Sequence, residues 1–284
     1  MRAQRTRRLA GIALLMLAVG LGAVAWRDTT RPALGEVTVP VSGLSREVTI
    51  LHVSDLHSEV FGEGQALISD LLGEQRFDAI VVNGDLVASF EADPAPAEQL
   101  LEVLAPHSDT LVFSRGNHDS ESLLEEIGAS DAAWLNETTD TVAVAPDAGS
   151  VLIATPTTAE ATPRATDCLV LVSHDTMTAQ DIATQDALPA DVRLYLFGHT
   201  HGGQIRLPLI GAIWAPEPCP LAPHGHTLLG GFLPDLRGRY VRGIYDTPDG
   251  AYVHVSPGLG THRLRVRLFD RAELTIVRLV PTEQ

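Results

Sequence analysis

The sequence predicts an α/β domain with a β-rich second half, held behind an N-terminal apolar segment, and three observations support this prediction. Strand-like and helix-like segments alternate through the first half of the chain. Several of the apolar strands are followed at once by Asp, Asn or His. The last third alternates with a period of two, which is typical of strands. Periodicity alone does not distinguish two packed sheets from one doubly wound sheet.

Residues 1–26 are predicted to be a targeting segment outside the fold. The segment is uncharged from Leu9 to Trp26, which is near the lower length limit for a membrane-spanning helix. Its charges all precede that run: Arg2, Arg5, Arg7 and Arg8. The positive-inside rule places these arginines in the cytoplasm and the remaining chain outside it. We expect a signal anchor in the cell membrane, and the alternative is a secreted domain cleaved after Ala23-Val24-Ala25.

The composition excludes electrostatic binding to polyanions. Without residues 1–26 the chain has 16 arginines, no lysine and 36 acidic residues, a formal charge of −20. We therefore expect no nucleic-acid binding and no basic patch for anionic lipid head groups, so that a phosphate ligand would be attracted by bound cations. Cys168 and Cys219 are too few for a disulfide framework. One bridge between them is open, although Cys168 lies in an apolar run and is expected to be buried.

The first half of the chain reads as a linker followed by alternating strands and helices. Residues 27–46 contain two prolines and two glycines and are predicted to be a linker to a domain over residues 47–284. The strands are predicted from β-branched and apolar runs, and the helices from leucine spacing. In order, they are a strand at Glu47–Ser54, a helix at Gly64–Gly73, a strand at Ala79–Val82, a helix at Pro96–Leu104, a strand at Thr110–Phe113 and a helix at Glu121–Ile127.

The second half is richer in strands. A hairpin is predicted from Thr141–Val144 and Val151–Ala154, followed by a Thr, Pro and Ala-rich loop at 155–166. Apolar strands at Cys168–Ser173 and Leu194–Phe197 flank a helix near 178–185. Three alternating strands are expected in the last third: Tyr240–Tyr245, Tyr252–Val255 and Leu274–Leu279.

Metal-ligating residue types follow five of the predicted strands. Functional groups of α/β folds collect beyond the carboxyl ends of strands, so these residues are expected to meet. The five segments are Asp55-Leu56-His57, Asn83-Gly84-Asp85, Gly116-Asn117-His118-Asp119, Ser173-His174-Asp175 and Gly198-His199-Thr200-His201. Any one of them is more often a turn or a helix cap than a ligand. Together they indicate a site for divalent metals such as Mn, Fe or Zn.

The motifs DLH, GD, GNHD, SHD and GHTHGG, in this order, resemble the calcineurin-like metallophosphoesterase superfamily over roughly residues 47–280. GHTHGGQIRLPLIGA and GLGTHRLRVRL further resemble a bacterial branch of membrane-anchored phosphoesterases, the YkuE/YaeI-like group. The resemblance implies a four-layer α/β/β/α sandwich of two mixed sheets with the metal site at one edge. The 155–166 loop and the stretch 215–238 depart from that group, and both border the expected substrate cleft.

The resemblance implies two metal ions that share Asp85. The ligands of the first would be Asp55, His57, Asp85 and His201. Those of the second would be Asp85, Asn117, His174 and His199. A carboxylate has two oxygens to share between cations, and Asn117 can ligate only through its amide oxygen.

Catalytic roles follow from the same resemblance. His118 is expected to stabilise charge on the phosphoryl oxygens or to protonate the leaving group, with Asp119 orienting its ring. Arg115 either contacts the substrate phosphate or forms a surface ion pair. His262 either approaches the cleft or lies in an exposed turn. Of the other histidines, His52 and His107 are expected to play no catalytic part. His224 and His226 could suggest a third metal, but a substrate-side loop over the cleft is preferred for them.

The function implied is hydrolysis of a phosphomonoester or phosphodiester by a hydroxide that bridges the two metals. The substrate would be extracytoplasmic or associated with the cell envelope. Two alternatives stay open: a metal-stabilised scaffold or binding protein without turnover, and a protein phosphatase acting on phosphoserine or phosphothreonine. A preference for phosphopeptides over small diesters would select the latter.

Overall fold

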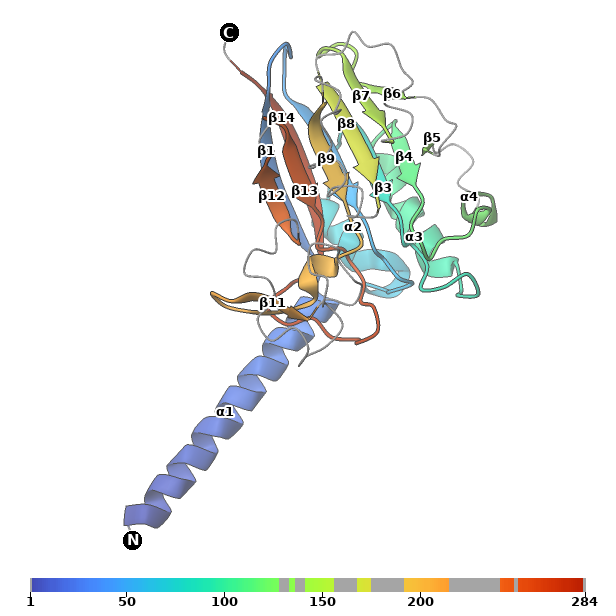
Figure 1. The fold of residues 1–284 in the computed structure, drawn as a ribbon. Helices are drawn as coiled ribbons and strands as arrows, with labels where there is room; N and C mark the ends of the chain where they lie inside the picture. The colour runs from blue at the N-terminus through green and yellow to red at the C-terminus, as the bar shows by residue number, and fades with distance from the viewer. Residues whose placement is uncertain are drawn as a thin grey trace.

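The computed structural model describes residues 2–127, 133–135, 141–155, 168–174, 192–214, 241–247 and 250–282. The chain begins with α1 (Arg2–Thr30), a long helix that projects from one end of the domain (Figure 1). By length and composition α1 is able to cross a membrane, and its apolar window is entirely unburied. This agrees with the predicted targeting segment, but the helix continues past Trp26 and ends against the domain.

The first sheet is mixed and contains six of the described strands. In spatial order they are β1 (Ala33–Val41), β14 (Glu273–Pro281), β2 (Val48–Val53), β3 (Ala79–Asn83), β4 (Leu111–Ser114) and β5 (Ala133–Leu135). Strands β2 to β5 are parallel, as crossover connections require. β14 is antiparallel to β2 and parallel to β1.

The second sheet is also mixed. Its described strands, in spatial order, are β12 (Gly243–Asp246), β13 (Tyr252–Val255), β9 (Val192–Phe197), β8 (Cys168–Ser173), β7 (Val151–Ala154) and β6 (Val142–Val144). The four central strands are parallel, and β6 and β7 form the predicted hairpin. After β9 come a 3₁₀ turn, η3 (His201–Gly203), and a hairpin of β10 (Ile205–Leu207) and β11 (Gly211–Trp214).

The two sheets pack face to face through β-branched and leucine side chains. Ile50 and Val81 of the first sheet share one buried cluster with Val170 and Leu196 of the second. The outer face of the first sheet is covered by helices whose leucine and isoleucine residues form another buried cluster. These helical elements are η1 (Glu63–Gln65), α2 (Ala66–Leu72), α3 (Ala95–Leu104), η2 (Ala105–His107) and α4 (Leu123–Glu126). The predicted helix near 178–185 lies outside the described residues.

The prediction of a linker over residues 27–46 is wrong. The helix α1 continues to Thr30, and residues 33–41 form β1, which pairs with β14 along its full length. Pro40 misled the sequence reading, because proline is excluded only from central strands and β1 is an edge strand. Val39 and Val41 point into the core between the sheets.

The topology places the end of α1 at the carboxyl ends of the parallel strands. β1 starts directly after α1 and runs parallel to β14, which runs antiparallel to β2. The start of β1 therefore lies at the edge where β2 ends. Figure 1 shows η3 and β11 at this same end of the domain, while the C-terminus lies at the other end.

Candidate metal centre

The structure brings together the polar residues that follow the strands. Asp55 and His57 come after β2, Asp85 after β3, Asn117 and His118 after β4, His174 after β8, and His199 and His201 after β9. Both sheets contribute, because parallel strands of each end at the same edge. All seven predicted ligands lie at this edge, within two groups and the residues next to them.

The first group consists of Asp55, His57 and His201. A ligand atom of each lies within 4.8 Å of the others, and all three residues are buried. The carboxylate of Asp55 accepts hydrogen bonds from the backbone amide of His199 at 3.0 and 3.2 Å. This contact holds the loop after β9 against the loop after β2, so the two sheets jointly fix the group.

The second group consists of Asp85, His174 and His199, also buried and within 4.8 Å of one another. Asn117 joins it through its amide oxygen, which lies 3.1 Å from Nδ1 of His199. The two groups meet at Asp85, whose Oδ2 lies 3.3 Å from Nε2 of His57 and 3.1 Å from Nε2 of His174. One carboxylate oxygen thus faces an imidazole from each group.

The imidazole of His174 indicates why a cation fits here. Its Nδ1 lies 2.8 Å from the carbonyl oxygen of Asn83, which can only accept, so Nδ1 carries a proton. Nε2 then faces Asp85 Oδ2, and two acceptors at 3.1 Å repel unless a cation or a proton lies between them. Burial lowers the pKa of His174, but Asp85 and Asp55 outweigh it and raise the pKa to about 10. A metal ion would replace that proton.

Other buried ring nitrogens without a hydrogen bond also indicate a cation site. Neither ring nitrogen of His57 meets hydrogen-bond geometry, although Nε2 lies near Asp85, and His174 Nε2 likewise has no hydrogen bond. Burial would raise the pKa of Asp85, but His174 and His57 hold it well below its ordinary value. Burial lowers the pKa of His201 and keeps that ring neutral. Ionised carboxylate and neutral imidazole are the forms that bind metals.

The ligand loops hold strained backbone conformations. Asp55, His57, Asp85, His199 and His201 all have φ between 48° and 67°, a left-handed region that non-glycine residues seldom adopt. Such residues cost of order 1–3 kcal/mol each and cluster at functional sites. The backbone here is therefore constrained to present these side chains, at the expense of stability.

Two glycines are required by the close approach of the loops after β3 and β4. A Cβ on Gly116 would collide with the Asp85 carboxylate, and one on Gly84 would collide with the backbone of Gly116. Gly84 also has a φ of 73°. These glycines allow the Asp85 and Asn117 loops to touch.

The role predicted for Asp119 is wrong. Its buried carboxylate accepts hydrogen bonds from the backbone amides of Asp85 at 2.7 Å, Leu86 at 2.9 Å and Gly116 at 2.9 Å, and no hydrogen bond joins it to the ring of His118 among the described residues. Burial and the nearby Asp85 raise its pKa. Asp119 fixes the Asp85 loop because a charged acceptor satisfies several amides that point inward.

His118 is oriented by the backbone instead. Its Nδ1 donates to the carbonyl oxygen of Ala88 at 2.9 Å, and its amide donates to Asp85 Oδ1 at 2.9 Å. The ring lies 5.0 Å from that of His57 and 4.9 Å from that of His262, centroid to centroid. His262 therefore approaches the site, which was one of the two readings of its position.

The other residues singled out in the sequence lie away from the metal centre or outside the described residues. Arg115 forms a surface ion pair with Glu121 at 3.4 Å, which was the alternative to a substrate contact. Cys168 is buried, as expected. Cys219, His224, His226 and most of the 155–166 loop lie outside the described residues. His52 is buried, and its Nδ1 lies 3.0 Å from Nδ1 of His254.

A buried ion pair beneath the loop after β9 escaped the sequence analysis. Arg267 is fully buried and donates to Asp270 at 2.9 Å, to the carbonyl of Pro257 at 2.7 Å and to that of Gly260. Its Nη1 also lies 3.4 Å from the carbonyl oxygen of His201. The motif GLGTHRLRVRL contained the signal, because a buried arginine amid apolar neighbours needs a charged partner.

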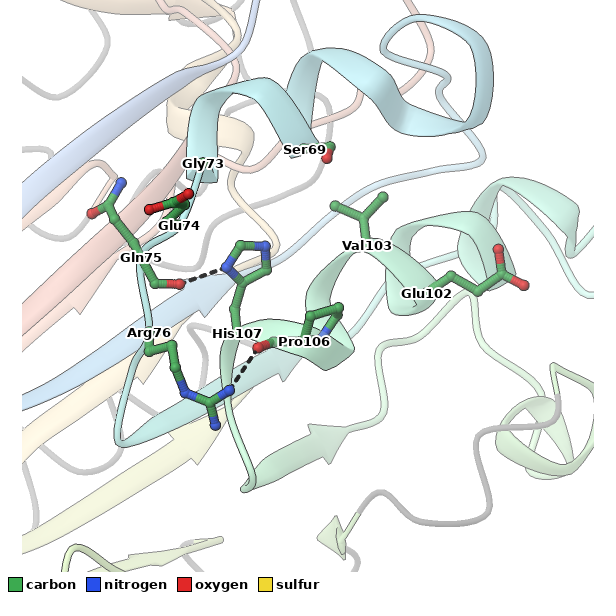
Figure 2. Close-up of a pocket in the computed structure, with 9 residues that line it drawn as sticks. All are labelled: Ser69, Gly73, Glu74, Gln75, Arg76, Glu102, Val103, Pro106 and His107. Atoms are coloured by element: carbon green, nitrogen blue, oxygen red, sulfur yellow. Dashed lines mark hydrogen bonds between the residues drawn. The ribbon is translucent and has the colours of Figure 1, made fainter.

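One of the described cavities is remote from this chemistry. It has a volume of about 500 Å³ and lies between α2 and α3, at the amino ends of β3 and β4 (Figure 2). Two of its polar side chains are engaged in the fold: His107 Nδ1 bonds to the carbonyl of Gln75 at 2.6 Å, and Arg76 donates to the carbonyl of Pro106 and to the carboxylate of Asp109. The cavity therefore offers no cluster comparable to the metal centre.

The fold and the cluster together define a two-sheet α/β protein with buried His and Asp residues, able to hold metal ions, at the carboxyl ends of its strands. Comparison with protein-family models gives a match to the calcineurin-like phosphoesterases over residues 48–203. The chain belongs to this family. The family implies divalent metal ions, and the clustered residues fit them.

Similar proteins include two bacterial ones and a bovine one. The uncharacterized metallophosphoesterase YkuE of Bacillus subtilis (strain 168) is 36% identical over 91 residues, 32% of this chain and 25% of that protein. A Bos taurus transmembrane protein with a metallophosphoesterase domain is 32% identical over 108 residues, 37% and 18% of the two chains. Metallophosphoesterase Cj0846 of Campylobacter jejuni is 23% identical over 281 residues, 87% and 63% of the two chains.

Each match spans less than two thirds of the relative's own length. Among solved structures, the phosphopantetheinyl hydrolase PptH of Mycobacterium tuberculosis covers 57% of this chain and 83% of its own. Its TM-score is 0.33 and its sequence identity is 11%.

Proposed function

We propose that the protein is a membrane-anchored phosphoesterase that hydrolyses phosphomonoester or phosphodiester bonds with the aid of two divalent cations. The observation that carries this proposal is the position of Asp85, whose Oδ2 faces His57 at 3.3 Å and His174 at 3.1 Å. One cation would be held by Asp55, His57, Asp85 and His201, and the other by Asp85, Asn117, His174 and His199. Mn, Fe and Zn suit this set of imidazoles and oxygens.

When bound, two such cations supply a hydroxide nucleophile at neutral pH, by lowering the pKa of a shared water toward about 7, and offset charge on the phosphate. The chain's own contribution is to hold the ligands. Asp119 fixes the amide of Asp85, the Asn83 carbonyl fixes the proton on His174 Nδ1, and the left-handed backbone aims the side chains inward. These contacts prepare the site before substrate arrives.

His118 is the proposed catalytic residue outside the ligand set. Because its Nδ1 donates to Ala88, its Nε2 is available to a substrate at the mouth of the site, where the ring is half-buried. There, with a second proton on Nε2, the ring would donate a hydrogen bond to a phosphoryl oxygen or pass that proton to the leaving group as the P–O bond breaks. Asp119 acts through the loop and not on the substrate.

The location is proposed from α1. Arg2, Arg5, Arg7 and Arg8 would stay in the cytoplasm and α1 would cross the membrane, so that the catalytic domain and its substrate lie outside the cytoplasm. Because α1 runs without a linker into β1, the domain is proposed to begin at about residue 31. In intact spheroplasts, protease should digest a tag placed after Gln284, and protection of that tag would reverse the orientation.

Hydrolysis by the purified full chain in detergent tests the activity. The substrates are nitrophenyl phosphate and methyl nitrophenyl phosphate, each with Mn²⁺, with a chelator and with Asp85→Asn. We expect turnover that disappears with the chelator and with the variant, and the faster ester gives the substrate class. Turnover that persists in chelator would reject the metal-dependent mechanism. No turnover of either ester with any divalent metal would favour a scaffold.

A further inference from the structure

Large apolar side chains are exposed on one end of the domain. Outside α1, the described residues expose six of them: Val60, Phe90, Leu209, Ile210, Leu264 and Phe269. Every one lies in a segment that follows the carboxyl end of a strand, β2, β3, β9 or β13. Leu209, at the turn between β10 and β11, has a fully exposed side chain. Exposed apolar residues gathered at one end mark an interaction surface.

Two arginines lie among them. Arg263 and Arg265 are exposed on either side of Leu264. The segment around them is tied to β10, because Arg206 donates to the carbonyl of Leu268 at 2.9 Å and Leu268 donates to that of Gln204 at 3.0 Å. We call the surface formed by Leu209, Ile210, Arg263, Leu264, Arg265 and Phe269 the docking face. It is a local exception to the acidic composition, from which no basic patch for lipids was expected.

The helix α1 is fixed to the same end of the domain. The amide of Arg267 donates to the Thr29 hydroxyl at 2.8 Å, the amide of Ala272 donates to the Asp28 carbonyl at 2.9 Å, and Arg271 donates to the carbonyl of Arg31 at 2.6 Å. Asp28 is buried. The last turn of α1 is therefore part of the domain, and the position of the helix sets the orientation of the domain.

The length of α1 determines where the docking face lies relative to the bilayer surface. The uncharged run Leu9–Trp26 is about 27 Å long at 1.5 Å per residue, close to the roughly 30 Å hydrocarbon thickness of a bilayer. Trp26 and Arg27 then fall at the interface, which both residue types favour. Asp28, which contacts the domain, lies within about one helical turn of them. With α1 across a bilayer, this end of the domain would lie at the head groups.

We propose that the docking face rests on the bilayer that α1 enters, with its apolar side chains at the boundary of head groups and acyl chains and its arginines on anionic head groups. The lipid surface is the occupant because the anchor continues into this end of the molecule. The combination of arginine with leucine and phenylalanine is that of interfacial membrane segments.

The docking face adjoins the metal centre. His262, next to Arg263, has its ring 5.2 Å from that of His57 and 4.9 Å from that of His118. A substrate that reaches the site from the bilayer would pass this segment. If the proposed function holds, the substrate is therefore a phosphate ester carried by an amphiphile in the membrane.

The contact is tested without turnover. The full chain is placed in phosphatidylglycerol-containing nanodiscs, with an environment-sensitive fluorophore on Leu209→Cys in a Cys219→Ser background. The matched control is Ser42→Cys, exposed in the turn between β1 and β2 at the other end of the domain. We expect spin-labelled lipids to quench the label at 209 at least several-fold more than at 42. Equal quenching at both positions, or none at 209, would overturn the docking face.

The substrate class is tested with two diesters that share a scissile bond. Methyl nitrophenyl phosphate is water-soluble, and hexadecyl nitrophenyl phosphate is embedded in vesicles. In each, water adds to phosphorus as the bond to nitrophenolate breaks. For a Leu209→Asp and Ile210→Asp double variant we expect about a tenfold loss on the hexadecyl ester and an unchanged rate on the methyl ester. Equal effects on both esters would reject the amphiphile. If the parent protein hydrolyses neither, the proposed function fails, while the quenching still decides the docking face.

Discussion

The backbone amide of Arg267 donates a hydrogen bond to the hydroxyl of Thr29 at 2.8 Å, and the guanidinium of the same arginine lies 3.4 Å from the carbonyl oxygen of His201. One buried residue therefore joins the last turn of α1, through its backbone, to the loop of a candidate metal ligand, through its side chain. Its ion pair with Asp270 and its bonds to Pro257 and Gly260 satisfy the charge inside the protein.

Replacing Arg267 should destabilise the domain strongly. Arg267→Met removes the guanidinium donors from the carbonyls of Pro257 and Gly260 and one buried charged partner from Asp270, which keeps its ion pair with Arg242. Breaking a buried pair in this way costs about 3–5 kcal/mol. The measurement is the thermal unfolding midpoint of the full chain in detergent. The control, Arg278→Met, removes exposed pairs with Glu36 and Glu47 and should cost at most about 1 kcal/mol. Equal shifts would contradict the structural role.

Asp119→Asn should weaken metal binding without ending catalysis. The amide side chain removes the charge that organises the amides of Asp85, Leu86 and Gly116. Loss of such a supporting contact typically costs about 10–100-fold in metal affinity. The Mn²⁺ concentration that gives half of the maximal hydrolysis rate measures this affinity, and Asp109→Asn, at an exposed position, is the control. A lower maximal rate at an unchanged metal requirement would instead support the catalytic role first predicted for Asp119.

Gly116→Ala should abolish hydrolysis. The added methyl group collides with the Asp85 carboxylate, so the loops after β3 and β4 must separate. Gly250→Ala is the comparison, since its φ of 85° is strained but nothing lies within 4 Å of the added carbon. We expect this second variant to lose some stability and keep its activity. An active Gly116→Ala protein would show that the loops tolerate separation.

Stability should fall below neutral pH because of His52 and His254. Burial holds the pKa of His254 at about 3 and that of His52 well below its ordinary value. The folded state keeps both rings neutral, whereas the unfolded chain binds protons near pH 6.5. Their stabilising contribution is complete above that pH and is lost as the pH falls toward 3.

Unfolding measured with chelator at several pH values tests this linkage. Each proton taken up contributes about 1.4 kcal/mol per pH unit. His254→Gln should make the slope between pH 6 and 4 shallower by up to that amount. An unchanged slope would mean that the ring of His254 is already charged in the folded protein.

Strand positions and candidate ligand residues could be predicted from the sequence because each is a local pattern. β2, β3, β4, β8 and β9 are apolar runs, and the polar residues after them are consecutive in the chain. The packing of the two sheets, which brings His174 next to Asp85, depends on residues far apart in the chain. It was predicted only from the resemblance to a family. The metal residues are brought together as that resemblance implies.

What could not be predicted depends on distant partners. β1 contains Gly35 and Pro40 and reads as a linker until β14, from the far end of the chain, pairs with it. The orientation of His118 depends on its hydrogen bond to the carbonyl of Ala88. Every residue has a backbone carbonyl, so a sequence does not indicate which of them a side chain will contact. Asp119 follows a histidine and reads as its partner, although its carboxylate is directed into the neighbouring loop.

The most direct test of the proposed centre is to count the metal ions bound per chain, with and without the Asp85 carboxylate. Purified full chain is equilibrated with Mn²⁺, freed of excess ions, and measured by elemental analysis together with Asp85→Asn. We predict about two ions per chain for the parent protein. The variant should retain at most one and lose activity, because Asp85 faces both groups. A parent protein with a single ion at full activity, or a variant that keeps two ions and its rate, would contradict a shared Asp85.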